Sequence, residues 1–177
     1  MNRKSSRTLI FWLMLATFVM PVKAQVTLEC MKPNDGQNIG QVVIDSNTPV
    51  ERAKMRLAPF PATRVGKHIL IVHWKKGLQR FADVAPYMVG EIAGTYWVYC
   101  GYSREVGVHA VQKNGEDVNS GVLIDDKTGK ILPGGFAVKF SPDRAKYIAY
   151  EQVDGSDFSN LKLYRRDGTL IWSGLDG

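Results

Sequence analysis

The chain has 177 residues, with 23 Lys and Arg against 17 Asp and Glu and a formal net charge of +6 at pH 7. Residues 1–24 hold four of the basic residues and no acidic one, so the remaining 153 residues carry only +2. This charge is too small for the dense basic face that nucleic-acid binding requires, so we expect no nucleic-acid partner. A chain of this length suits one domain with a self-sufficient core.

Residues 1–24 are predicted to be a cleaved secretory signal peptide. A basic start with Arg3, Lys4 and Arg7 precedes the uncharged apolar run Thr8–Met20, and Ala24 ends a cleavage site before Gln25. The alternative is a retained membrane anchor, but the apolar run is shorter than the roughly twenty residues that span a bilayer. We therefore expect a single domain over residues 25–177, periplasmic or secreted, without a stable membrane anchor.

The first part of that domain is predicted to contain two strands and an irregular connection. Val26–Cys30 and Gln41–Asp45 have the short apolar pattern of strands. Ser46–Gly66 holds three prolines and shows no clean periodicity, so we expect a long surface connection over the core. Within it, Val50–Leu57 fits one or two helical turns, because Pro49 suits the first helical position and Pro59 ends a helix.

The middle of the chain is predicted to be a run of strands. They are His68–Trp74, Leu78–Val84, Thr95–Gly101 and Val106–Gln112. The four consecutive apolar residues Ile69–Val72 predict a central strand that is buried on both faces.

Three hairpins follow between Gly121 and Gly174, where apolar runs too short for helices alternate with turns. Their turns are Asp125–Gly129, Ser141–Ala145 and Arg166–Gly168, and the last contains the tight-turn dipeptide Asp-Gly. In all we expect about ten short strands and little helix. This pattern predicts an all-β fold, either an antiparallel sandwich or partial-propeller-like sheets.

The two cysteines, Cys30 and Cys100, both lie in the part predicted to be exported. An even count in an oxidising compartment favours a disulfide, which on the chain-entropy model stabilises the fold by roughly 4 kcal/mol. The alternative is two buried free thiols. Neither cysteine lies in a recognisable nucleophile motif.

One hairpin resembles a known family. Phe140–Asp143 followed by Tyr147–Tyr150 is similar to the F-S-P-D-G-x-x-I-A-Y pattern of β-propeller blades in the Tol-system periplasmic protein, with Arg144 where the pattern has glycine. Asp126–Lys130 is similar to a turn of quinoprotein propeller blades. The resemblance covers about one blade and a hairpin, and a closed propeller needs at least four blades of about 40 residues. It therefore implies a style of hairpin and no functional residue.

The layout also resembles, more loosely, the periplasmic immunity proteins of type VI secretion amidases, which are exported all-β proteins with a disulfide. That resemblance implies an inhibitor that acts through protein contact.

No catalytic or metal-binding motif stands out. His68 and His73 are five apart on one strand and so point to opposite faces, and His109 has no acidic partner nearby in sequence. Asp154–Asp157 lacks the spacing of a calcium loop and fits a plain turn. We therefore expect no enzyme, no cofactor and no metal. Tyr96, Trp97, Tyr99 and Tyr102 leave a carbohydrate-stacking groove open as a minor alternative.

Basic residues are concentrated between Glu51 and Arg80, where eight Lys and Arg face a single acid. This asymmetry favours a partner with an acidic surface. The predicted contact site is the hairpin with Trp74, Lys75, Lys76 and Arg80, in which an exposed indole would lie beside cations. In the competing interpretation Trp74 packs inward and the lysines keep the sheet edge soluble.

We therefore expect a non-catalytic binding or inhibitor protein of the periplasm, similar to an immunity protein. Two alternatives remain open at this point: a hydrolase of peptidoglycan or glycan, and a structural subunit of an envelope complex.

Overall fold

The computed structural model describes residues 24–30, 48–84, 94–115, 118–153 and 159–176. These residues form antiparallel strands and one short helix, which confirms the all-β fold class. The predicted strand Gln41–Asp45 and the acidic turn Asp154–Asp157 lie outside the described residues.

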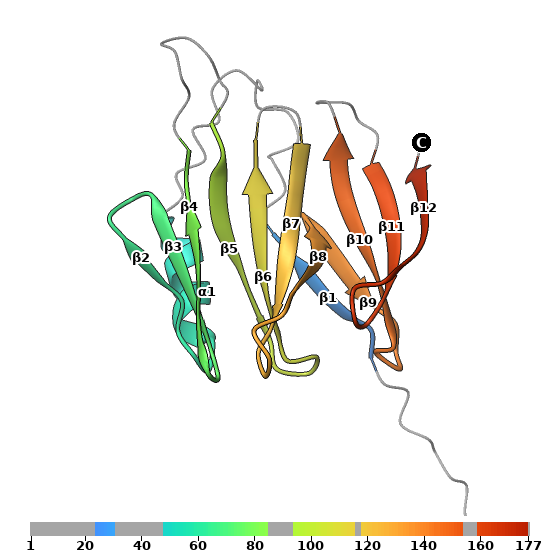
Figure 1. Cartoon of the computed structure of the whole chain (residues 1–177), viewed down its shortest axis with the longest axis horizontal. Coiled ribbons are helices and arrows are strands. Elements are labelled where there is room, and N and C mark those ends of the chain that lie inside the picture. Colours follow the sequence, from blue (N-terminus) through green and yellow to red (C-terminus); the bar gives the residue numbers. More distant parts are fainter. Residues whose placement is uncertain (1–23, 31–47, 85–93, 116–117, 154–158, 177) are drawn as a thin grey trace, which may run out of the picture.

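The strands form three successive antiparallel sheets (Figure 1), of which the second and third are hydrogen-bonded to each other into a continuous nine-stranded arrangement. The first sheet contains β2 (Thr63–Val65), β3 (Ile69–Trp74) and β4 (Gly77–Ala82). The second contains β5 (Tyr96–Ser103), β6 (Val108–Asn114), β7 (Val118–Asp125) and β8 (Ile131–Gly135). The third contains β9 (Ala137–Phe140), β10 (Lys146–Val153), β11 (Ser159–Arg165) and β12 (Leu170–Asp176), with β1 (Val26–Glu29) paired to β9.

The second and third sheets are joined where β8 continues into β9. At this joint β7 and β10 also pair over two residues each. The backbones approach so closely that only glycine fits, because a Cβ added at Gly135 would lie 2.0 Å from the carbonyl oxygen of Tyr150. One at Gly121 would lie 2.6 Å from the carbonyl oxygen of Gly135. The two sheets therefore meet backbone to backbone.

The second sheet is covered on both faces, and each face carries its own hydrophobic cluster. Toward the third sheet, Val108 and Leu123 pack with Phe140 and Tyr147. Toward the first sheet, other residues of the second sheet pack with buried residues from β3, β4 and α1; they include Tyr99, Val111, Ile124, Leu70, Val72, Phe81 and Met55. The three sheets thus form a stack with two cores.

The predicted burial of β3 on both faces is wrong. β3 is the central strand of its sheet, but only Leu70 and Val72 are fully buried, while Ile69 and Ile71 on the other face stay partly exposed. Among the described strands the longest unbroken buried run is in β6, from Val108 to Gln112, and β5 has a shorter one from Val98 to Gly101. A continuous apolar run therefore does not show that both faces of a strand are buried.

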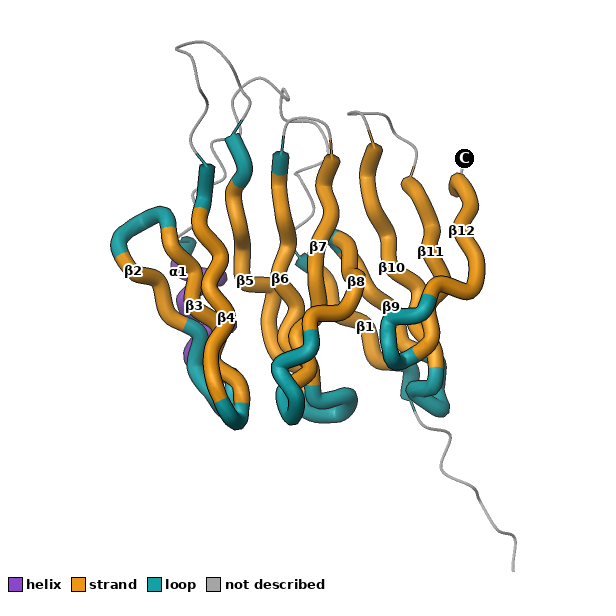
Figure 2. Tube along the Cα trace, in the orientation of Figure 1, coloured by secondary structure: helices purple, strands orange, loops and turns teal. Residues whose placement is uncertain are grey.

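The region predicted to be an irregular connection holds a helix and a strand. α1 (Pro49–Leu57) begins where the Thr48 side chain accepts a hydrogen bond from the Glu51 N–H at 3.1 Å, and it ends before Pro59. The short helix predicted over Val50–Leu57 is therefore confirmed, whereas β2 was not predicted. Figure 2 shows α1 behind the first sheet, where Met55 enters the core.

Cys30, just after β1, and Cys100, on β5, form the predicted disulfide, with their Cα atoms 4.7 Å apart. Both side chains are buried beside the core between the second and third sheets. The bond fixes the N-terminal strand to the middle of the stack.

Among the described residues, no helix is long and apolar enough to cross a membrane.

Candidate protein-binding face

The first sheet buries one face and leaves the other without a partner among the described residues. Because side chains alternate along a strand, the register of β2, β3 and β4 assigns each residue to one side. The inner side carries Leu70, Val72 and Phe81, which are buried against the second sheet. We call the opposite side the outer face; its residues are Thr63, Val65, Ile69, Ile71, His73, Leu78, Arg80 and Ala82.

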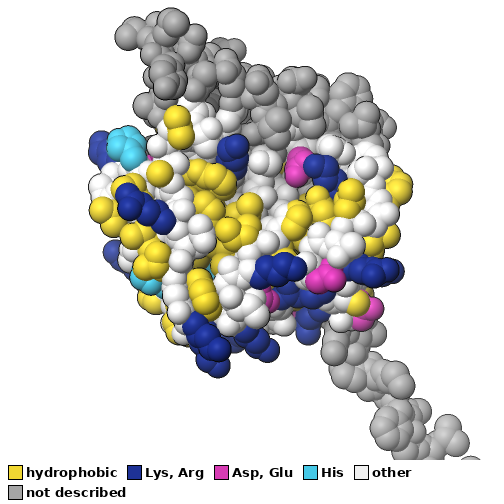
Figure 3. All heavy atoms as spheres, viewed as in Figure 1, with side chains coloured by type: hydrophobic (Ala, Val, Ile, Leu, Met, Phe, Trp, Pro, Cys, Tyr) yellow, Lys and Arg dark blue, Asp and Glu magenta, His cyan; other side chains and the backbone are white. Residues whose placement is uncertain are grey.

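Most of the outer face is apolar and accessible. Val65 is 55% exposed and Leu78 is 54% exposed, and Ile69 and Ile71 lie between them on the central strand, partly exposed. Figure 3 shows hydrophobic side chains mixed with basic ones on the side of the molecule where this sheet lies. Isolated exposed apolar residues are ordinary, whereas a row of them across adjacent strands is a common feature of interaction surfaces.

Cations lie on the outer face and at one end of it. Arg80 lies on it, opposite Ile71, and Lys75 and Lys76 form the exposed hairpin tip at its end. None of these three side chains has a carboxylate partner among the described residues. Their charge is therefore available to an acidic partner.

Trp74 does not belong to this face. It pairs with Gly77 on the inner side, and its indole packs on the core between the first and second sheets. A Cβ added at Gly129 would lie 2.3 Å from the indole, so this glycine makes room for the ring. The predicted site is thus divided: Lys75, Lys76 and Arg80 are exposed, but Trp74 packs inward and cannot act as the exposed anchor.

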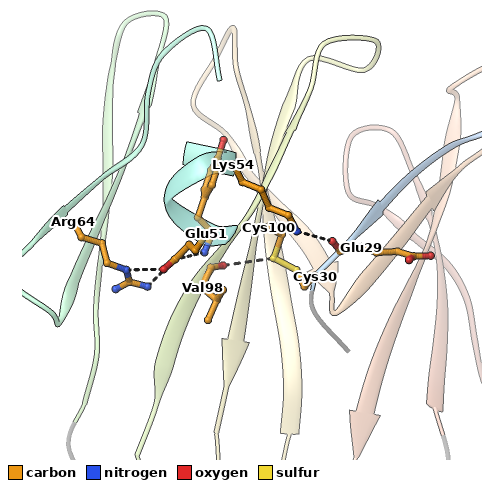
Figure 4. The surroundings of a disulfide bond; sticks show 8 residues. Glu29, Cys30, Glu51, Lys54, Arg64, Val98 and Cys100 are labelled. Carbon is orange, nitrogen blue, oxygen red and sulfur yellow. Dashed lines mark hydrogen bonds and ion pairs between the residues drawn. A yellow bond between two sulfur atoms is a disulfide. The ribbon is translucent and has the colours of Figure 1, made fainter. Parts of the chain in front are cut away.

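The outer face rests on a buried polar network beneath it. Arg64 of β2 points inward and donates to both carboxylate oxygens of Glu51 on α1, at 3.2 and 2.9 Å, and to the carbonyl of Trp97. The same carboxylate accepts the N–H of Tyr99 at 2.8 Å. Figure 4 shows Arg64 reaching from its strand toward Glu51. These bonds hold α1 and the first sheet rigidly to β5.

Asp83, just after β4, adds to this attachment. Its carboxylate accepts the N–H of Trp97 at 2.9 Å and lies 3.8 Å from Arg64. Asp83 was not singled out from the sequence, and Arg64 was counted only among the eight basic residues that favoured an acidic partner, whereas its charge is paired with Glu51. In the sequence, each of the two residues looks like an ordinary surface charge. Their buried contacts appear only when the first sheet is packed against β5.

The hairpin tip is also fastened from outside its own sheet. The Lys75 N–H donates to the carbonyl of Asp126, at the turn between β7 and β8, at 3.1 Å. The Asp126 N–H in turn donates to the carbonyl of Gly107, between β5 and β6, at 3.0 Å. The basic tip is therefore held in position by two turns of the second sheet.

The histidines do not assemble a metal site. His68 is exposed just before β3, His73 lies on the outer face, and His109 is completely buried on β6. Within the part of the chain that the structure describes, no group of three or more His, Cys, Asp or Glu side chains could hold a metal ion.

His109 does have a polar environment that the sequence did not suggest. Its Nδ1 is 2.9 Å from the Tyr99 hydroxyl, and its Nε2 is 3.8 Å from Asp126 Oδ1. Burial lowers the pKa of His109, and the nearby Asp126 carboxylate partly opposes that shift. The imidazole lies beside the core between the first and second sheets, where it also packs against Tyr102 with ring centroids 4.8 Å apart.

The aromatic residues proposed for a carbohydrate groove are mostly used in packing. Tyr99 is fully buried, and Trp97 packs against Phe81 with ring centroids 4.7 Å apart.

A hollow of about 270 Å³ lies between β1, α1 and β5, next to the disulfide. It is lined by Leu28, Glu29, Lys54, Leu57, Gly101 and Tyr102, among others.

Comparisons with known proteins add no relative. No protein-family model matches the chain, and neither the curated proteins nor the solved structures contain a match.

Proposed function

We propose that this protein is an exported, non-catalytic binding protein that holds a partner protein through the outer face of its first sheet. The proposal includes an inhibitor role similar to that of immunity proteins, in the periplasm or outside the cell. It rests chiefly on one observation: an apolar sheet face, rigidly backed, that no other described element covers.

The shape of the face supports a protein partner over a small molecule. Small ligands bind in concave pockets that enclose most of their surface. The outer face is instead the flat side of three strands, with Leu78 and Val65 standing exposed on it. A flat apolar patch with a polar rim is typical of protein interfaces.

The charge of the rim supports an acidic partner. Arg80, Lys75 and Lys76 lie on or beside the apolar patch, and a partner with carboxylates around its own apolar residues would complement them. Export is supported by the buried disulfide between Cys30 and Cys100, because such bonds form and persist in oxidising compartments.

The test is capture of a partner by wild-type protein and by variants that differ only in where a charge is placed. Leu78→Asp puts a carboxylate on the outer face beside the basic hairpin tip, and Ile131→Asp makes the same change on β8, where the side chain is also exposed. With envelope extract as the source, wild type and Ile131→Asp should retain the same protein and Leu78→Asp should lose it. Titration of that purified protein should give a Kd at least tenfold higher for Leu78→Asp.

Two outcomes would contradict the proposal. One is a captured partner that binds Leu78→Asp as tightly as wild type. The other is turnover of peptidoglycan or glycan by the purified protein, which would favour the hydrolase alternative.

A further inference from the structure

The third sheet ends in an edge strand, β12, that differs from the last strands of the other two sheets. β12 pairs only with β11, so the N–H and C=O groups along its other side have no strand partner among the described residues. The strand is seven residues long and lies at one end of the molecule (Figure 1). Exposed edges of this length are sites at which other chains add a strand.

The last strands of the other two sheets carry features that block such addition. β4 holds Arg80 and follows the basic tip Lys75–Lys76, and charged side chains discourage strand pairing. β8 holds Pro133, which has no N–H to donate. From Leu170 to Leu175, β12 contains neither a charged residue nor a proline.

β12 also exposes its apolar side chains. Leu170 is 52%, Ile171 43% and Trp172 52% exposed, a run of three consecutive large apolar residues. On one side of the strand, Trp172 continues an apolar surface of the third sheet, because it lies opposite Leu163 of β11. Leu163 in turn lies opposite the partly exposed Ile148 of β10. Pairing along β12 would therefore extend an existing apolar surface and satisfy backbone groups at once.

A second copy of the same strand is the occupant that fits this edge. Two identical strands related by a two-fold axis run antiparallel, and each supplies the donors and acceptors that the other lacks. Because Leu170–Leu175 is uncharged, no like charges would face each other across the pair.

We propose that β12 is a self-association edge, at which two copies of this chain join their third sheets by antiparallel strand pairing. The first sheets lie at the other end of each stack (Figure 1), so their outer faces stay accessible in the dimer. The dimer then presents two outer faces. This inference does not depend on the proposed function.

The experiment measures solution mass against concentration for the exported chain, expressed with its full sequence, by sedimentation velocity. Ser173→Lys adds a cation to the exposed middle of β12, where two copies would bring the two lysines close together. Leu78→Lys makes a comparable change on the outer face. We expect a monomer–dimer equilibrium for wild type and Leu78→Lys, and a dimer dissociation constant at least tenfold higher for Ser173→Lys. Matching melting temperatures would show that Ser173→Lys is folded.

A wild-type protein that remains monomeric up to millimolar concentration would overturn the proposal. So would a dimer that tolerates Ser173→Lys but is lost in Leu78→Lys, because that pattern would place self-association at the outer face. If Ser173→Lys fails to fold, Ser173→Glu provides the same repulsion with the opposite sign and the same expected loss of dimer.

Discussion

Arg64 and Arg80 belong to the same three-stranded sheet but point to opposite faces. Arg64 is buried, with its guanidinium bonded to Glu51 and to the carbonyl of Trp97. Arg80 is exposed on the outer face. Removing one partner of a buried ion pair leaves the other charge buried and uncompensated, whereas an exposed cation contributes little to stability.

We therefore predict that Arg64→Met lowers the free energy of unfolding by about 3–5 kcal/mol. The reason is that the Glu51 carboxylate would remain buried without its main partner. Chemical denaturation followed by circular dichroism measures the change. Arg80→Met is the matched control and should stay within about 0.5 kcal/mol of wild type. If Arg64→Met and Arg80→Met lower the free energy of unfolding equally, the bonds of Arg64 to Glu51 do not stabilise the fold as proposed.

The lowered pKa of His109 leads us to expect that the stability of the fold depends on pH. Because burial lowers its pKa, the folded state binds the proton more weakly than the unfolded state, in which the pKa is near the usual 6.5. Stability therefore rises with pH wherever the unfolded chain holds more protons. The contribution of His109 to stability is fully present above the pKa of the unfolded state. It decreases as the pH falls through that value toward the lower pKa of the folded state.

We predict that the free energy of unfolding is smaller at pH 5.5 than at pH 7.5, and that His109→Gln reduces this difference. His73→Gln changes a residue of the accessible outer face and should keep the wild-type dependence. Denaturation curves of the three proteins at the two pH values provide the comparison. An unchanged pH dependence in His109→Gln would show that another group is responsible.

At the level of elements, the β3–β4 hairpin combines a rigid base with a charged tip. Trp74 anchors its inner side, and the N–H of Lys75 is held by the turn at Asp126. The side chains of Lys75 and Lys76 remain exposed. A tip held in this way loses little conformational entropy on binding, and its charge acts mainly on the rate of encounter.

Replacing Lys75 and Lys76 together by Glu should leave the melting temperature nearly unchanged, because neither side chain is buried. The association rate with an acidic partner should fall strongly, and the remaining rate should depend less steeply on salt. Stopped-flow mixing at several ionic strengths measures both effects. Lys146→Glu, an exposed change on the third sheet, is the control. If a partner associates equally fast with the double variant, the basic tip has no part in binding.

For the whole molecule, the sequence predicted the kinds of elements better than their arrangement. The hairpin turns were predictable because their signals are local: Gly129 and Gly168 have the positive φ angles that favour glycine. Arg144, which replaces the glycine of the resembling blade pattern, also adopts a positive φ of 61°. The turn therefore keeps a left-handed backbone at position 144, although arginine stands there in place of glycine.

The candidate site could be predicted only in part. Alternation along β3 shows that Ile71 and Val72 face opposite ways, but not which of them meets the second sheet. Which face of β3 is buried depends on packing against α1 and β5, which are separate elements of the chain. The same packing decides whether Trp74 or Arg80 is exposed. The pairing of Arg64 with Glu51 likewise appears only when β2 and α1 are placed side by side. The cations at the tip were predictable because a hairpin turn is exposed whichever way the sheet packs.

The pairing of β1 with β9 has a consequence for how the chain matures. Val26 lies opposite Phe140, so β1 and its strand partner are separated by more than a hundred residues of chain. Cys100 comes well before β9 in the chain, and its bond to Cys30 can tether β1 to β5 before β9 has folded. A disulfide that forms before β9 has folded would thus shorten the search of β1 for its partner, and in a reduced chain β1 would stay an unpaired strand without that tether until β9 folds.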